Sequence, residues 1–284
     1  MVIDKIITLA NSKVRLRFQA MERSLRDCGC TLPLLVIPYD ETRFKLPNNS
    51  SWWEMDEISD WLKTYDAHPT MRKYQCLTVE NYQFTDADVI FLKNPEIALK
   101  DVTGFVTSCG HWNNPGHTYT SESLELLKKK STLWQKFIFN TGQFACDSSL
   151  FSIKELKKKA DECKSTCLVF PYHEQPGINL LVNTSGIPIH NLTLPPFNME
   201  STWAGDYEEE NFKARWHQSN QPYLIHWAGC DMNTYRPIDE LFYFYLTREE
   251  KKEWEESLRK NKQLENSKSV LLQKLKKIYR VIKE

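Results

Sequence analysis

The stretch that decides the predicted fold is Asn81-Tyr-Gln-Phe-Thr-Asp-Ala-Asp-Val-Ile-Phe-Leu-Lys-Asn-Pro95. Asp86 and Asp88 stand two residues apart, and the apolar residues 89–92 follow at once, so we interpret the pair as the exposed end of a buried strand. Side chains two apart in an extended chain point to one face, roughly 6.5 Å apart, and can reach one ion. Hard cations such as Mg²⁺ and Mn²⁺ favour such carboxylates. The stretch predicts a metal site, with a solvated turn between two strands as the alternative.

The N-terminal segment predicts a β-α-β unit. Residues 5–10 form a short β-rich run, residues 13–27 carry apolar side chains at helical spacing, and residues 32–38 form a second apolar run. The turn Thr8-Leu-Ala-Asn-Ser12 lies at the carboxyl end of the first strand. Open α/β sheets bind their ligands at that edge, so we expect this turn to contact a ligand.

Strand and helix patterns alternate along the rest of the chain. We predict capping boxes that start helices at Ser51 and Ser152, a strand-turn-strand unit over residues 137–151, and a final short strand within residues 223–230. Residues 171–182 predict a loop that passes into a helix with proline in its first turn. Residues 183–221 are polar, contain Trp203 and Trp216, and form a candidate substrate loop.

Composition and charge exclude several classes of protein. The chain has 284 residues, 41% of them hydrophobic, which is enough for a full core. Its formal net charge is zero, so nucleic acid is not the expected partner. The N-terminus has an acid inside its apolar segment and no basic leader, unlike a signal peptide. No apolar run approaches the roughly 18 residues of a membrane span. We expect a soluble, cytoplasmic protein.

Cysteine and glycine usage narrows the chemistry further. The 8 cysteines fit reduced thiols, and Cys28-Gly-Cys30 and Cys163-Lys-Ser-Thr-Cys167 lack the paired spacing of a structural zinc site. With only 9 glycines, no Gly-x-Gly occurs, so the dinucleotide fingerprint and the Walker loop are absent. If the protein binds phosphate, a metal and basic side chains must hold it. Arg72 and Lys73 are candidates, because positive charge at a helix start suggests an anion nearby.

The composition changes at Thr247, where a third capping box with Glu250 starts a run of helix formers. We therefore predict one α/β domain over residues 1–246 and a helical, basic amphipathic segment over residues 247–284. Its end, residues 271–284, places leucines and isoleucines on one face and lysines on the other. Such a helix can lie peripherally on an anionic membrane surface. Packing against the domain or a partner is the interpretation we favour.

Four short motifs occur in an order that resembles the metal-dependent nucleotide-sugar glycosyltransferases of the GT-A fold. They are Asp86-Ala-Asp88, Asn140-Thr-Gly142, Glu174-Gln175 and His226-Trp-Ala-Gly-Cys230. Over roughly residues 2–237 the chain resembles the retaining family 8, the glycogenin and lipopolysaccharide galactosyltransferase type, and family 34, the galactosyl, mannosyl and xylosyl type. The resemblance implies an α/β, GT-A-like (Rossmann-like) mixed sheet flanked by helices, with a helical C-terminal appendage.

The resemblance also implies roles for individual residues. Asp86, Asp88 and His226 would bind Mn²⁺ or Mg²⁺, and Glu174 and Gln175 would lie beside the reacting sugar as catalytic residues. The donor, a UDP- or GDP-sugar, would contact Thr8, Leu9, Ala10, Asn11, Arg72, Lys73, Asp86, Ala87, Asn140, Thr141, Gly142, Trp227, Gly229 and Arg236.

The predicted function is metal-dependent transfer of a hexose or pentose from a nucleotide-diphosphate sugar to a hydroxyl of a carbohydrate or glycoconjugate acceptor, with retention. Two alternatives stay open. A sugar nucleotidyltransferase would share a similar sheet, but such enzymes normally carry a glycine-rich loop that this chain lacks. A non-catalytic carbohydrate-binding protein on the same fold would bind sugar without turnover.

Overall fold

A computed structural model of the chain describes residues 1–113, 120–130, 132, 134–169, 173–216, 220–232 and 235–260. Its strands are β1 (Lys5–Ala10), β2 (Leu34–Pro38), β3 (Ser50–Trp52), β4 (Tyr82–Asp86), β5 (Val89–Phe91), β6 (Phe105–Thr107), β7 (Gln143–Cys146), β8 (Ile189–Asn191) and β9 (Leu224–His226). Its α-helices are α1 (Arg15–Asp27), α2 (Asp56–Lys63), α3 (Pro95–Leu99), α4 (Ser121–Lys130), α5 (Ile153–Glu162), α6 (Lys164–Cys167), α7 (Gln175–Ser185) and α8 (Glu240–Phe244). Residues 248–260 are also helical.

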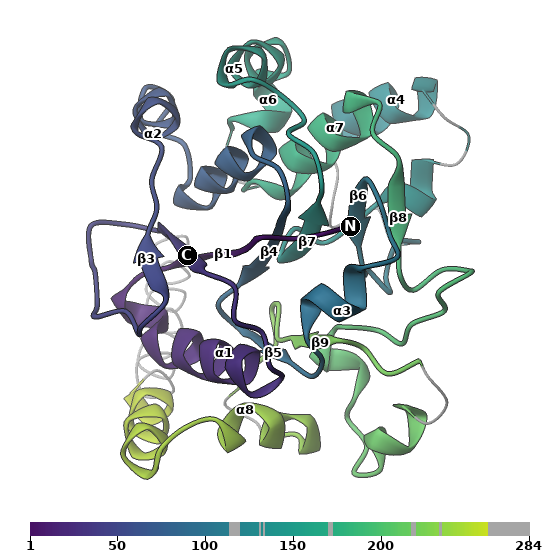
Figure 1. Ribbon diagram of the computed structural model, residues 1–284. Helices are drawn as coiled ribbons and strands as arrows, with labels where there is room; N and C mark the ends of the chain where they lie inside the picture. The colour runs from purple at the N-terminus through teal and green to yellow at the C-terminus, as the bar shows by residue number, and fades with distance from the viewer. Residues whose placement is uncertain are drawn as a thin grey trace, which may run out of the picture.

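Seven strands form one mixed sheet in the order β3-β2-β1-β4-β7-β6-β8 (Figure 1). Strands β3, β2, β1 and β4 pair in parallel, β7 is antiparallel to both its neighbours, and β8 is parallel to β6. Strands β5 and β9 pair antiparallel in a separate two-stranded sheet. The predicted mixed sheet flanked by helices is confirmed, and so is the opening β1-α1-β2 unit.

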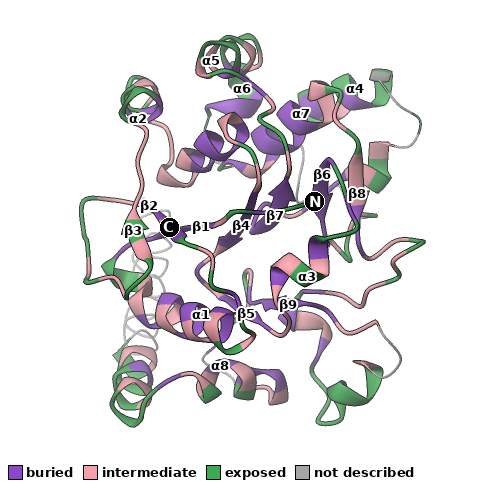
Figure 2. Ribbon diagram, in the orientation of Figure 1, coloured by how far each residue is buried: buried purple, intermediate pink, exposed green. Residues whose placement is uncertain are grey.

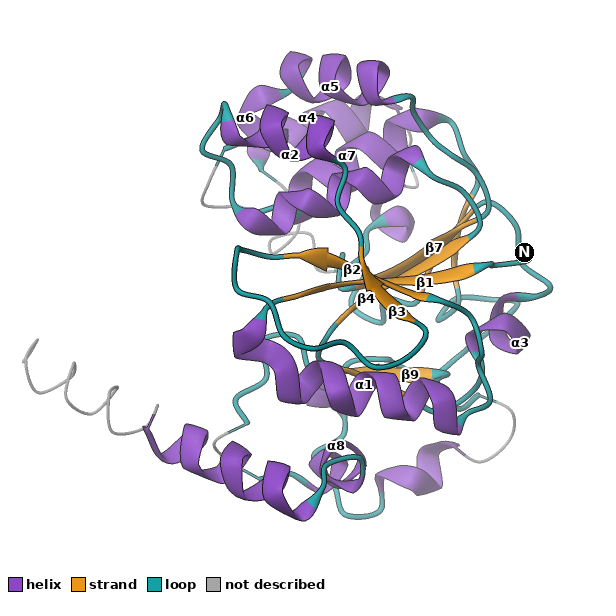
Figure 3. Ribbon diagram, turned by 60° about the vertical axis from the view of Figure 1, so that its left-hand side comes forward, coloured by secondary structure: helices purple, strands orange, loops and turns teal. Residues whose placement is uncertain are grey.

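Helices cover both faces of the large sheet. Figure 3 shows α2, α4, α5, α6 and α7 on one face, and α1 on the other face with α8 beyond it. Figure 2 shows the buried residues concentrated on the strands and on the helix sides that face them. The rings of Phe84, Phe105 and Phe144 stack at the centre, with ring centroids 5.0 and 5.3 Å apart. Removing this apolar surface from water holds the layers together.

The chain leaves the large sheet inside the Asp86-Ala-Asp88 motif. Strand β4 ends at Asp86, and β5 begins at Val89 and pairs with β9 in the small sheet. Asp88 therefore lies in a turn and not on the strand that also carries Asp86. The prediction that one strand presents both carboxylates is wrong, because the residues after Asp88 pair with β9 instead of continuing β4.

Two other local predictions are also wrong. Ser51 does not cap a helix: it pairs with Leu35 in β3, and α2 begins later, after Met55, without a side-chain cap. The segment before Asn140 is a 3-10 turn, η4 (Trp134–Phe137), and not a strand. The capping box at Ser152 is confirmed, since Ser152 and Glu155 exchange hydrogen bonds of 2.9 and 3.3 Å.

The described part of the C-terminal segment packs against α1. The guanidinium of Arg23 donates two hydrogen bonds, of 2.5 and 2.8 Å, to Glu250, and Trp254 is buried beside α8. Thr247 and Glu250 form the predicted capping box. Residues 271–284, whose sequence predicts a basic amphipathic helix, lie outside the described residues. None of the described helices is long and apolar enough to span a membrane.

Candidate functional site

Asp86, Asp88 and His226 lie close together. Asp86 is the last residue of β4, Asp88 lies in the turn that follows, and His226 is the last residue of β9. Nε2 of His226 lies 3.3 Å from Oδ1 of Asp88 and 3.8 Å from Oδ2 of Asp86. One donor atom from each residue lies within 4.8 Å of the other two. The β5-β9 register, which pairs Val89 with His226, brings these distant parts of the sequence together.

The Asn140-Thr-Gly142 turn supports this cluster. The amide N–H of Asp86 donates to the carbonyl of Gly142 at 2.7 Å, and the amide of Gly142 donates to Oδ1 of Asn140 at 2.8 Å. A β-carbon at residue 142 would come within 1.9 Å of the His226 ring. Glycine is therefore needed because the imidazole of His226 packs against it, whereas the family resemblance implied that Gly142 contacts the donor.

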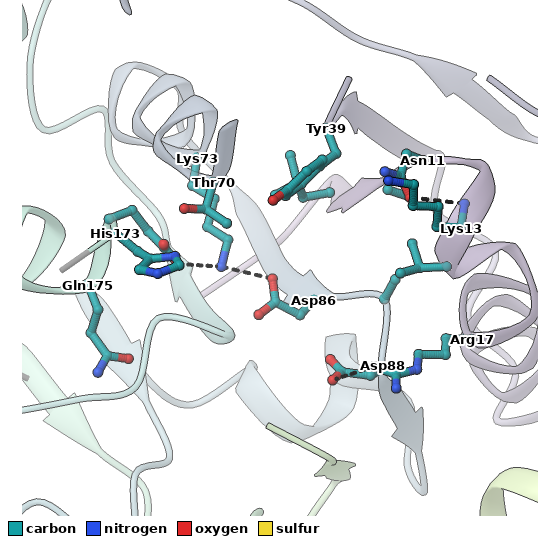
Figure 4. Close-up of a pocket in the computed structure, with 15 residues that line it drawn as sticks. Asn11, Lys13, Arg17, Tyr39, Thr70, Lys73, Asp86, Asp88, His173 and Gln175 are labelled. Carbon is teal, nitrogen blue, oxygen red and sulfur yellow. Dashed lines mark hydrogen bonds and ion pairs between the residues drawn. The ribbon is translucent and has the colours of Figure 1, made fainter. Parts of the chain in front are cut away.

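A buried lysine links the cluster to Glu174. Nζ of Lys73 lies 2.9 Å from Asp86 and 2.7 Å from Glu174, and its side chain is only 3% exposed. The hydroxyl of Thr141 donates to the same Glu174 oxygen at 3.0 Å, and the amide of Thr141 donates to Gln175 at 3.2 Å. Figure 4 shows Lys73 reaching toward Asp86, with Asp88 and Arg17 on the opposite side.

These contacts fix the charges of the site. Burial works to raise the pKa of Asp88, but the charges of His226 and Arg17 outweigh it and hold that pKa at about 2. Burial likewise opposes ionisation of Glu174, yet Lys73 lowers the pKa of Glu174 to about 2. Burial raises the pKa of Asp86 in spite of Lys73. At neutral pH, Asp88 and Glu174 are therefore carboxylates.

A cavity of about 710 Å³ opens beside the two aspartates (Figure 4). It lies at the carboxyl ends of β1 and β4, the edge at which open α/β sheets bind ligands. Its walls carry both signs of charge. The residues that line it are Leu9, Ala10, Asn11, Lys13, Val14, Arg17, Tyr39, Thr70, Lys73, Asp86, Ala87, Asp88, His173, Glu174 and Gln175. We call it the first cavity.

A second cavity, of about 680 Å³, lies on the His226 side of the cluster. Its lining residues are Cys109, Gly110, His111, Asn140, Gln143, Gln175, Thr202, Trp203, His226, Ala228 and Gly229. Gln175 borders both cavities. The Asp86-Asp88-His226 cluster lies between them: the two aspartates line the first cavity, and His226 lines the second.

The family profile of the nucleotide-diphospho-sugar transferases matches residues 80–236, more than half of the chain. The chain belongs to this nucleotide-diphospho-sugar transferase family. The matched residues include Asp86, Asp88, Glu174 and His226, whereas Lys73 and the part of the first cavity formed by residues 9–17 lie before the match. No curated protein matches the chain.

Solved glycosyltransferases share the fold of this family member. LgtC, a galactosyltransferase crystallised with donor and acceptor sugar analogues, is 13% identical, with a TM-score of 0.50 over 86% of this chain and 96% of its own. GlyE of Streptococcus pneumoniae is 11% identical, with a TM-score of 0.53 over 94% of this chain. The bifunctional glycosyltransferase WbbM is 11% identical, with a TM-score of 0.50 over 91% of this chain.

The chain spans only 51% of the WbbM chain and 64% of the GlyE chain. The predicted GT-A fold and the resemblance to family 8 are confirmed. Sequence identities of 11 to 13% show a shared fold and nothing more. The resemblance to family 34 stays a prediction.

Most residues predicted for the transferase site gather at the two cavities. Leu9, Ala10, Asn11, Lys73, Asp86, Ala87, Asp88, Glu174 and Gln175 line the first, and Asn140, Gln175, His226 and Gly229 line the second. Thr141 and Gly142 lie behind the cluster, against Glu174 and His226.

Besides Thr141 and Gly142, four predicted residues line neither cavity. Thr8 is fully buried within β1. Arg72 donates to the carbonyl of Pro38 and to Glu54, each at 2.9 Å. Trp227 and Arg236 both donate to Asp239, at 2.7 and 3.1 Å, in the apolar cluster around α8. These contacts give Arg72, Trp227 and Arg236 a structural explanation, whereas the buried hydroxyl of Thr8 has no hydrogen-bond partner among the described residues.

The sequence did not single out several lining residues. One of them is Arg17, whose Nη1 lies 3.5 Å from Oδ2 of Asp88. Arg17 stands one helical turn after Val14, close to the loop predicted to bind a ligand, and this spacing could have indicated that it faces the site. Tyr39, Thr70 and His173 carry no comparable pattern. Trp203 lies inside the predicted substrate loop and contacts the site through its backbone pairing with His226.

The donor set fits a divalent cation. Ligands about 2.1 Å from a six-coordinate cation lie about 3.0 to 4.2 Å from one another, which is the range of the His226–aspartate distances. Two carboxylates and one imidazole leave further positions for other oxygen ligands. The imidazole nitrogen favours Mn²⁺ over Mg²⁺, which prefers oxygen alone.

Proposed function

We propose that this nucleotide-diphospho-sugar transferase moves a hexose or pentose from a UDP- or GDP-sugar to a hydroxyl of a carbohydrate or glycoconjugate, in a reaction that requires Mn²⁺ or Mg²⁺ and retains the anomeric configuration. The observation that carries the proposal is the Asp86-Asp88-His226 cluster, held together by β4 and β9 between the first and second cavities. Two cavities on either side of one metal-ligating cluster suit a donor and an acceptor that must meet.

The charges of the first cavity suit a nucleotide diphosphate. Its lining has three cations, Lys13, Arg17 and Lys73, and three carboxylates, Asp86, Asp88 and Glu174. These cancel, so a bound dication gives the cavity a surplus positive charge that matches a diphosphate. This balance supports binding of an anionic donor without any glycine-rich phosphate loop.

Asp86, Asp88 and His226 would hold the cation. When bound there, a divalent cation supplies Lewis-acid stabilisation of the negative charge that develops on the leaving diphosphate. Lys73 contacts the other oxygen of Asp86 and so holds this carboxylate in place. Arg17 is the cation that we assign to the diphosphate in place of Arg236, because it lines the first cavity beside Asp88.

Glu174 and Gln175 would act on the sugar being transferred. Lys73 and Thr141 both donate to one oxygen of Glu174, so this carboxylate is ionised and fixed in orientation. A fixed carboxylate stabilises positive charge that develops at the anomeric carbon. Gln175 borders both cavities, which places it where the donor sugar and the acceptor hydroxyl would approach each other.

Retention is part of the proposal because the motifs of the chain resemble those of the retaining family 8. Inversion by direct displacement needs a base that takes the proton of the attacking hydroxyl. The described lining of the second cavity has no Asp or Glu, and its two histidines, His111 and His226, are the groups that could act as such a base. The anomeric proton of a transfer product, observed by NMR, distinguishes retention from inversion.

Donor hydrolysis tests the proposal. The protein is incubated with Mn²⁺ and a panel of UDP- and GDP-sugars, and the released nucleotide is measured. We expect release from one donor class, and loss of that release in Asp88→Asn with the fold intact by circular dichroism. Absence of release from every donor, together with no thermal stabilisation by nucleotide and Mn²⁺, would contradict the proposal. Sugar binding without turnover would favour a carbohydrate-binding protein, and pyrophosphate-dependent formation of nucleoside triphosphate would favour a nucleotidyltransferase.

A further inference from the structure

The second cavity differs in charge from the first. Its described lining contains no Asp, Glu, Lys or Arg, although the first cavity has six such side chains. Its polar groups are neutral amides and hydroxyls, among them Asn140, Gln143 and Thr202, together with two histidines. The imidazole of His226 is paired with Asp86 and Asp88, so the wall offers hydrogen bonds to hydroxyl groups but no unpaired counter-charge of Lys or Arg for a phosphate or a carboxylate.

Trp203 forms a fixed aromatic wall of the second cavity. Its indole N–H donates to the carbonyl of Ala228 at 2.8 Å, so the polar edge of the ring is already bonded. The ring packs over Gly205, where a β-carbon would come within 2.5 Å of the ring carbons. The residue as a whole is 36% exposed, which makes it one of the few exposed large hydrophobic residues.

The backbone ties this aromatic wall to the metal-ligating cluster. Trp203 forms a β-bridge with His226. The amide N–H of His226 donates to the carbonyl of Thr202, the residue before Trp203, at 2.7 Å. The imidazole of His111 meets the Trp203 ring edge-on, with centroids 5.1 Å apart, and Asp206 accepts from it at 3.0 Å. A β-bridge, hydrogen bonds and a ring contact therefore connect Trp203 and His111 to the Asp86-Asp88-His226 cluster.

From these features we infer that the second cavity binds the acceptor as an uncharged pyranose ring stacked on Trp203. One face of a pyranose is a patch of C–H groups that packs on an aromatic ring, while its hydroxyls reach neutral polar groups at the rim. A ring held there presents a hydroxyl toward Gln175 and His226, and so toward the first cavity. The inference rests on the proposed function and adds the chemical class of the acceptor.

The test is ligand-observed saturation-transfer NMR with the whole chain and no donor. The probes are the methyl α- and β-pyranosides of glucose, galactose and mannose, with a methyl glucuronide as the charged comparison. We expect saturation of ring C–H protons for at least one neutral glycoside and weaker saturation for the glucuronide. In Trp203→Ala the affinity should fall about tenfold, since the variant loses both the stacked ring and the buried area.

Two further variants keep the test decisive. Trp203→Phe keeps an aromatic ring and should retain most of the glycoside affinity. If Trp203 acted only through the hydrogen bond of its indole N–H, Trp203→Phe would lose as much glycoside affinity as Trp203→Ala. Phe244→Ala removes an aromatic side chain that is 73% exposed on α8 and lines neither cavity, so glycoside binding should not change.

The outcomes separate this inference from the proposed function. Donor hydrolysis by the wild-type chain without binding of any neutral glycoside, or equal binding by Trp203→Ala and wild type, overturns the inference alone. Glycoside binding that depends on Trp203, without release of nucleotide from any donor, supports the inference about the cavity and contradicts the proposed function.

Discussion

The imidazole of His226 lies directly against the α-carbon of Gly142, so that a β-carbon there would come 1.9 Å from Cε1 and 2.7 Å from Nε2. The backbone of Gly142 meanwhile accepts the amide hydrogen of Asp86. One glycine therefore sets the position of two of the three proposed metal ligands. No side chain larger than hydrogen fits between them.

Gly142→Ala should displace the His226 ring and weaken metal binding. Contacts this short do not occur, and the ring is the group able to move, since the backbone of Gly142 is held by Asp86 and Asn140. We expect Mn²⁺ affinity, measured from the electron paramagnetic resonance signal of unbound Mn²⁺, to fall about tenfold or more, with a loss of about 1–3 kcal/mol in the free energy of unfolding.

Gly104→Ala is the matched control. Gly104 has a φ of +77°, and its added β-carbon would lie 2.5 Å from the carbonyl oxygen of Pro188, in the contact between β6 and β8. This variant should lose comparable stability while it binds Mn²⁺ like the wild type. Equal metal affinity in both glycine variants would contradict the role of Gly142.

Lys73→Met should destabilise the fold. The substitution leaves the buried Glu174 and the half-buried Asp86 without the cation that pairs with both, and losing one partner of a buried ion pair costs about 3–5 kcal/mol. Urea denaturation followed by fluorescence measures the change. The double variant Lys73→Met/Glu174→Gln should recover part of the loss, because it removes one of the two unpaired carboxylates. A single variant as stable as the wild type would show that the pair contributes nothing.

The parts of this fold that could be predicted from sequence depend on local patterns. β1 and α1 follow from apolar spacing, and the order of the motifs was enough to place Asp86, Asp88 and His226 in one site. The break between β4 and β5 could not be predicted, because it depends on pairing of Val89 with His226, far away in the sequence. The same holds for the contact of Lys73 with Glu174 and for the bridge between Trp203 and His226. Arg236 matched a motif position, yet Asp239, three residues on, holds its guanidinium.

Arg17→Ala should weaken binding of a nucleoside diphosphate more than binding of the nucleoside. Arg17 lies 3.5 Å from Asp88, a long contact that leaves its planar donors suited to phosphate oxygens. We expect about a tenfold rise in the Kd for UDP or GDP in Mn²⁺, measured by calorimetry. Arg15→Ala, on the same helix and paired with Glu253, is the control and should bind like the wild type. An equal loss for nucleoside and diphosphate in Arg17→Ala would contradict the assignment.

Glu250→Gln should lower stability in a pH-dependent way. Hydrogen bonds from Arg23 lower the pKa of Glu250 below its usual value of 4.5, although partial burial opposes the shift. Because the folded state has the lower pKa, this stabilisation is complete above about pH 4.5 and is lost as the pH falls through the folded pKa. Urea denaturation should show a difference of about 1 kcal/mol at pH 7 that narrows at pH 3.5. Glu256→Gln, exposed on the same helix, should show no such narrowing.

Nucleotide binding with and without metal tests the central claim most directly. Calorimetric titration of UDP and of GDP into the wild-type chain should show binding in Mn²⁺ for at least one nucleotide. That binding should weaken at least about tenfold in EDTA and in Asp88→Asn, since Asp86, Asp88 and His226 would then hold no cation for the diphosphate. Equal affinity in Mn²⁺ and EDTA, or binding of neither nucleotide by the wild type, would contradict the account.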